Sequence, residues 1–73
     1  MYLLWFDDTT RKTTPVKISE AMAAYERHFK QRPNLVLVHE SEQVPVDGMV
    51  TRVEPFVRRN NFWIGHEVIE KAA

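Results

Sequence analysis

Asn-Leu-Val-Leu-Val-His-Glu, residues 34–40, is the stretch that decides the fold. It contains an unbroken run of aliphatic and β-branched residues, and such a run is typical of a strand that is buried on both faces. Pro33 interrupts the helical pattern before it, and a polar segment with a proline, residues 41–45, follows it. We therefore predict a central strand at this position.

The residues before this strand predict a first strand and then a helix. Residues 2–6, Tyr-Leu-Leu-Trp-Phe, are apolar on both alternating faces. Thr14 is the expected N-cap of the helix, with Pro15 at the first helical position and Pro33 as the stop. Apolar side chains then recur at helical spacing, at Ile18, Ala21, Met22, Tyr25 and Phe29. A strand, a helix and a strand of these lengths predict two parallel strands, either adjacent or separated by another strand.

Two more strands are expected after the central one, at residues 49–54 and 62–68. Two asparagines, Asn60 and Asn61, precede the last strand and tolerate the left-handed conformations of a hairpin turn, so we expect these two strands to be antiparallel partners. Residues 69–73 are expected to form a final helical turn or to fray. The predicted fold is a single α+β domain over residues 1–73, in the order β-α-β-β-β, with one amphipathic helix packed on a mixed sheet of three to four strands.

Composition limits the classes of function. The chain has 73 residues, no cysteine, and ten basic residues that balance ten acidic ones. A core of this size rarely contributes more than about 3–5 kcal/mol, and without disulfides a second subunit is a common addition. A neutral chain has no overall field that would attract nucleic acid or an anionic membrane. The apolar run at the start is too short for a secretory signal or a membrane span, so we expect a cytoplasmic protein.

The leading functional hypothesis follows from the number of apolar faces. One helix can cover one face of a sheet, but the first two strands are apolar on both faces, and a large exposed apolar patch is normally an interface. We therefore predict a non-enzymatic interaction module that forms a homo-oligomer or binds a protein partner, without a cofactor. The residues expected at this interface are Leu3, Trp5 and Trp63.

A second hypothesis rests on the sequence Arg58-Arg59-Asn60-Asn61-Phe62-Trp63. Adjacent guanidinium groups, amides and aromatic rings can hold phosphates and stack on bases. We expect either Phe62 or Trp63 to point into the core, because side chains alternate along a strand. Weak nucleic-acid binding would use Arg58, Arg59, Asn60, Asn61 and Trp63.

A third hypothesis is a metal or small-ligand site built on the histidines. His39 and Glu40 follow the central strand, and His66 and Glu67 lie at the end of the last one. The two histidines could share a ligand if the sheet brings them together, but antiparallel strands would place them at opposite ends. Asp7, at the end of the first strand, is a further candidate ligand or base. The spacing matches no recognised metal motif, and half-exposed histidines are the simpler interpretation.

Overall fold

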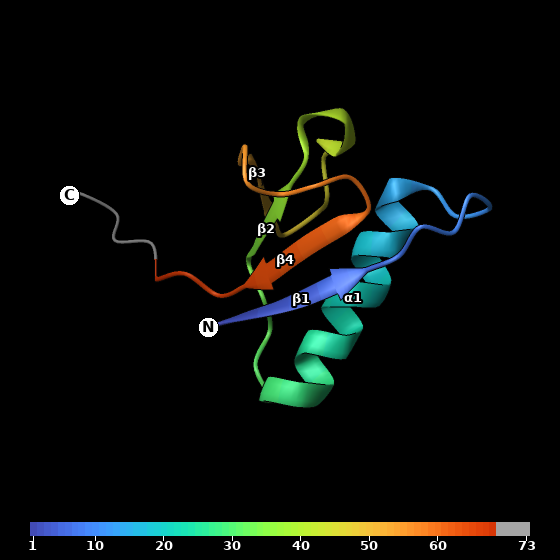
Figure 1. Ribbon diagram of the computed structural model, residues 1–73. Helices are drawn as coiled ribbons and strands as arrows, with labels where there is room; N and C mark the ends of the chain where they lie inside the picture. Colours follow the sequence, from blue (N-terminus) through green and yellow to red (C-terminus); the bar gives the residue numbers. More distant parts are fainter. Residues whose placement is uncertain (69–73) are drawn as a thin grey trace.

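A computed structural model describes residues 1–68 and confirms the α+β architecture, with one helix packed against one face of a four-stranded mixed sheet (Figure 1). The turn predicted at residues 69–73 lies outside the described part. In chain order the elements are β1 (Tyr2–Phe6), α1 (Thr14–Phe29), β2 (Leu35–Val38), a short 3₁₀ turn η1 (Glu40–Glu42), β3 (Val50–Val53) and β4 (Asn61–Gly65).

The strand order is β1-β4-β2-β3. β4 is antiparallel to both of its neighbours, and β2 and β3 are parallel. β1 and β2 therefore run parallel with β4 between them, which is one of the two arrangements that the strand-helix-strand pattern allows. Figure 1 shows β1 as the outermost strand on one side, and β3 occupies the opposite edge.

The predicted hairpin between β3 and β4 is wrong. β3 pairs with β2, so the chain must pass across β2 before it can form β4. Residues 54–60, which we call the crossing segment, make this passage. The segment ends at Asn60, whose φ of 65° is left-handed as the asparagines predicted, but there it closes a crossover rather than a two-strand turn.

The helix ends differ from the expected ones by a few residues. Thr13, with extended angles, is the N-cap, and Pro15 is the second helical residue. The helix ends at Phe29 because Lys30 adopts a left-handed conformation, with φ 55°, and donates its N–H to the Glu26 carbonyl at 2.9 Å. This is a common way for a helix to end, although glycine usually occupies the left-handed position. The helix thus stops before Pro33.

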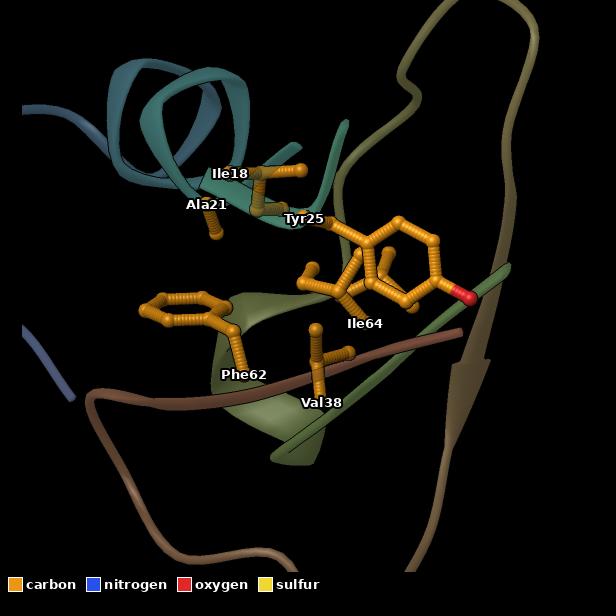
Figure 2. Packing of buried hydrophobic residues seen from close by; sticks show 7 residues of the cluster. Ile18, Ala21, Tyr25, Val38, Phe62 and Ile64 are labelled. Carbon is orange, nitrogen blue, oxygen red and sulfur yellow. The ribbon is translucent and has the colours of Figure 1, made fainter. Parts of the chain in front are cut away.

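The main core lies between α1 and the sheet. Figure 2 shows side chains from the helix facing those of the two central strands. Val44 and Val46 in the loop before β3 pack against this core and anchor the loop. The fully enclosed members of the cluster are Ile18, Ala21, Tyr25, Val36, Val38, Phe62 and Ile64.

All four residues of β2 are buried, as predicted for a central strand. Val36 and Val38 face the helix, whereas Leu35 and Leu37 belong to a second, smaller cluster on the other face. Within residues 1–68, no helix combines the length and the apolar character needed to cross a bilayer.

Candidate association surface

The face of the sheet opposite α1 is where the structure concentrates its uncovered apolar side chains. Leu4 and Leu37 both lie in register with Trp63 of β4, and residues in register point to the same side of a sheet. We call this side, which carries Tyr2, Leu4, Phe6, Leu35, Leu37 and Trp63, the open face.

The crossing segment covers the β2 half of the open face. Val57 is 1% exposed and packs on Leu35 and Leu37, which are themselves almost completely buried. Phe56 places its ring edge-on to Trp63, with 4.9 Å between the centroids. The expectation that the whole second face needs another chain is therefore wrong over β2, because the chain's own irregular segment shields it.

Nothing within residues 1–68 covers the β1 half of the open face. Tyr2, Leu4 and Phe6 are 40%, 61% and 63% exposed, and Phe56 is 53% exposed. The ring of Tyr2 lies over Gly65 and 6.3 Å from the ring of Trp63, so the aromatic side chains form a connected row. We call these residues the open-face patch: Tyr2, Leu4, Phe6, Phe56 and Trp63.

The structure corrects two of the three predicted interface residues. Leu3 and Trp5 are partly buried and pack against the helix-side core, so they do not belong to the open face. Both sides of β1 are apolar, and alternation alone therefore did not identify the side that faces the helix. Trp63 does lie on the open face, and the exposed residues of β1 are Tyr2, Leu4 and Phe6.

Among the strands that the structure describes, β1 has a partner on one side only. Asp7 donates its N–H to the carbonyl of Asn60 at 2.9 Å, continuing the β1–β4 ladder. In an antiparallel pair the residues that bond to one neighbour alternate with those that point away from it. The amides and carbonyls of Tyr2, Leu4 and Phe6 therefore point to the unpaired edge.

Charged side chains gather at the connection that leaves β1. Asp7 accepts the Thr9 N–H at 2.9 Å, and its Oδ2 lies 3.6 Å from the Lys12 ammonium, which is also 2.8 Å from Glu20. The hydrogen bonds from Thr9, helped by the nearby lysines, lower the pKa of Asp7 below its usual value. The hydrogen bond to Glu20 likewise raises the pKa of Lys12. Asp7 is thus a carboxylate whose charged form is stabilised by its neighbours in a turn.

The predicted basic and aromatic loop is divided between surface and interior. Arg58 and Arg59 are exposed, but Phe62 points into the core and is fully buried. Asn60 holds the loop in place, since its N–H donates to Glu42 Oε1 at 2.7 Å and its Oδ1 accepts from Lys17 Nζ at 3.2 Å.

Asn61 is also used locally, because its side-chain amide donates to the Arg59 carbonyl at 3.0 Å. The two asparagines therefore have structural roles in the described residues. The buried positions of Lys17 and Glu42, 6% and 8% exposed, had no signal in the sequence pattern, since both residue types are ordinarily solvated.

The two histidines do not converge. His39 follows β2 and His66 follows β4, and these strands are antiparallel, so the histidines lie at opposite ends of the sheet. His39 Nδ1 lies 2.8 Å from the Ser41 hydroxyl, and His66 Nδ1 lies 3.1 Å from the Arg32 carbonyl. Among residues 1–68, no three histidine or carboxylate side chains come together as a metal site would require.

Two pockets remain to be considered. One, of about 260 Å³, has His39 and two carboxylates at its rim beyond the ends of β2 and β3, and His66 is not part of it. The other, of about 450 Å³, is lined by five residues of the loop before β3 and one residue of β3, none with an ionisable side chain: Gln43, Val44, Pro45, Val46, Met49 and Thr51. Comparison with known proteins found no matching family model, no matching curated protein and no matching solved structure.

Proposed function

We propose that this protein is a non-enzymatic assembly module that self-associates through the β1 side of its open face. One observation carries the proposal: three large apolar side chains of one strand, Tyr2, Leu4 and Phe6, are each at least 40% exposed and lie side by side. Scattered exposed apolar residues are normal in a monomer, but a contiguous group is typical of an interface.

The size of the domain supports the same proposal. A chain of 73 residues buries only about 60% of the surface that it exposes when unfolded, so its core is small. Burial of one phenylalanine or leucine contributes about 1.5–3 kcal/mol. Leu4 and Phe6 are 61% and 63% exposed, so covering them in each of two copies would recover a large part of this contribution and offset the entropic cost of association.

The proposal assigns no catalytic residue and no cofactor, because the open-face patch consists of hydrocarbon and aromatic groups. We also propose that the protein acts in the cytoplasm. Localisation of a tagged chain in cells is the direct test of the compartment, and recovery from a secreted or membrane fraction would contradict it.

The test of self-association is sedimentation equilibrium between about 1 µM and 1 mM. We expect the wild-type mass to rise to that of a dimer, and Phe6→Ser to raise the dissociation constant at least tenfold, because about 1.4 kcal/mol corresponds to a factor of ten. Val16→Ser is the matched control, since Val16 is an exposed apolar residue on α1, at 46%, away from the patch. A wild-type chain that stays monomeric over this range would overturn the proposal.

Single-stranded nucleic acid is the second candidate. The observation that favours it is the combination of exposed Arg58 and Arg59 with the partly exposed ring of Trp63, since bases stack on aromatic rings beside cationic groups. The positive charge available to a nucleic acid on this face is modest, because Arg52 is already paired with Glu67 at 3.5 Å. Titration with single-stranded RNA and DNA at low salt should quench tryptophan fluorescence if this candidate is right, and Arg58→Ala with Arg59→Ala should abolish the quenching.

A further inference from the structure

We infer that a second copy of this chain pairs with β1 edge to edge, antiparallel, with the two-fold axis at Leu4. This inference rests on the proposed self-association and specifies its geometry. Two four-stranded sheets would thereby join into one continuous sheet of eight strands.

The hydrogen-bonding groups of the β1 edge support a strand as the occupant. The amides and carbonyls of Tyr2, Leu4 and Phe6 point away from β4, as the ladder continued by Asp7 and Asn60 shows. An edge with unpaired amides and carbonyls is a template for a further strand. A flat apolar partner alone would leave this edge unpaired.

The pattern of the strand is complementary to itself. In an antiparallel pair centred on Leu4, each Leu4 faces the other, and Tyr2 faces Phe6 of the second copy. The outward-pointing residues bond to one another in this register, and all five residues of β1 are used. A shift by two residues would leave the ends of the strand unpaired, so the centred register gives the largest number of bonds.

Charge favours the antiparallel direction. Residues 2–6 carry no charge, whereas Asp7 and Asp8 follow immediately. Parallel pairing would place the carboxylates of the two copies next to each other, and like charges across a strand pair are destabilising. Antiparallel pairing places them at opposite ends of the interface.

The other edge of the sheet lacks these features. β3 has only four residues, and Arg52 within it forms an ion pair with Glu67. Glu54 and Pro55 follow directly. Short length, charge and proline are the devices that protect edge strands from pairing. β1 is one residue longer and contains neither a charged residue nor a proline, so it is the edge that is better able to pair with another strand.

Edge pairing would also extend the apolar row. A two-fold axis at an antiparallel pair is perpendicular to the sheet, so the open faces of both copies lie on the same side and both helices on the other. Tyr2 of one copy then packs beside Phe6 of the second, and Leu4 packs on Leu4. Phe56 lies over β4, one strand farther from the axis.

The decisive variant is Leu4→Pro, compared with Leu4→Ala. The Leu4 N–H does not bond to β4, and proline is tolerated in edge strands at such positions, so the monomer should still fold. The proline removes one hydrogen bond donor from each copy, whereas alanine keeps both. We expect Leu4→Pro to raise the dimer dissociation constant at least about tenfold beyond Leu4→Ala. Near-ultraviolet circular dichroism checks that each variant is folded.

A measurement on the wild-type chain keeps the inference testable if the proline variant does not fold. In the centred register, the α-protons of Leu3 in one copy face those of Trp5 in the other, because these residues form a pair without mutual hydrogen bonds. Isotope-filtered NMR on a mixture of labelled and unlabelled chains should show this contact between copies. Its absence in a dimeric sample would overturn edge pairing.

The outcomes separate this inference from the proposed function. A wild-type monomer at all concentrations overturns both. A dimer that Leu4→Pro and Leu4→Ala weaken equally, and that Phe56→Ser dissociates, overturns edge pairing but leaves self-association through stacked open faces.

Discussion

Position 65 has no room for a side chain. A Cβ built on Gly65 would fall 2.4 Å from two ring atoms of Tyr2, well inside van der Waals contact. Glycine in a strand ordinarily weakens it, and it is often found where another group approaches closely. Gly65 therefore allows Tyr2 to lie flat across β4 and to join the aromatic row.

We predict that Gly65→Ala lowers the free energy of unfolding by about 1–2 kcal/mol, because the methyl group displaces the Tyr2 ring. In a Tyr2→Ala background the same substitution should be neutral or stabilising, since the obstruction is gone and alanine suits a strand better than glycine. Urea unfolding of the four proteins at one concentration measures this double-mutant cycle. Equal effects in both backgrounds would show that Tyr2 does not occupy this position.

Asn60 combines a left-handed backbone with two part-buried hydrogen bonds, to Glu42 and from Lys17. We predict that Asn60→Ala costs about 2 kcal/mol of stability, because alanine is strained at positive φ and leaves the Lys17 ammonium without its acceptor. Asn60→Gly should cost about 1 kcal/mol less, because glycine removes only the strain. Thermal denaturation compares the two, with exposed Arg59→Ala as the control expected to change stability by less than about 0.5 kcal/mol.

The residue type did predict the backbone conformation at position 60. Asparagine is among the residues that tolerate a left-handed conformation, so a turn at Asn60 followed from the sequence. The partners did not follow, because Lys17 is 43 residues away and lysine is ordinarily solvated. Contacts that a buried charged residue makes with a polar partner far along the chain become visible only when the fold is known.

At the scale of elements, α1 ends without the glycine that usually terminates a helix, and Lys30 adopts the left-handed conformation instead. We predict that Lys30→Gly raises the free energy of unfolding by about 1 kcal/mol, because glycine adopts this conformation without steric cost. Ala23→Gly, at an exposed position in the middle of the helix, should lower it by about the same amount. Chemical denaturation of both variants measures the two changes in the free energy of unfolding, which should have opposite signs. A destabilising Lys30→Gly would contradict the left-handed conformation of Lys30.

The elements themselves were predictable, whereas their pairing was not. Hydrophobic periodicity located β1, α1 and β2, because these patterns depend on near neighbours. The partner of β3 is set by contacts between residues far apart in the chain. The two asparagines at the start of β4 suggested a hairpin with β3, but β3 pairs with β2 instead. The side of β1 that faces the helix was equally undetermined, because both sides are apolar.

At the scale of the whole molecule, β4, the last strand within residues 1–68, is central and β1 is at the edge. We predict that a fragment ending at residue 60 is unfolded, because β1 and β2 then lack the strand that joins them. A fragment starting at residue 7 should keep α1 packed on three strands, with lower stability. Far-ultraviolet circular dichroism and amide exchange distinguish the two fragments, and a folded 1–60 fragment would contradict the strand order.

One helix does not shield both sides of the sheet, as the apolar residues on both faces of the first two strands predicted. This pattern did not indicate that the crossing segment buries Leu35 and Leu37 beneath Val57, because coverage by an irregular segment has no periodic signal in the sequence. Within the described residues the β1 side of the open face stays uncovered. The proposed self-association depends on this side alone.

The central place of β4 has a consequence for synthesis on the ribosome. While β4 is still within the exit tunnel, residues 1–60 lack the strand that joins β1 to β2, and only β2 and β3 have their native partner available. The aromatic side chains of β1 stay unprotected during this time. On a polysome many such nascent chains lie close together. The interval before β4 emerges is therefore when premature contact between neighbouring copies, or the need for a chaperone, should be greatest.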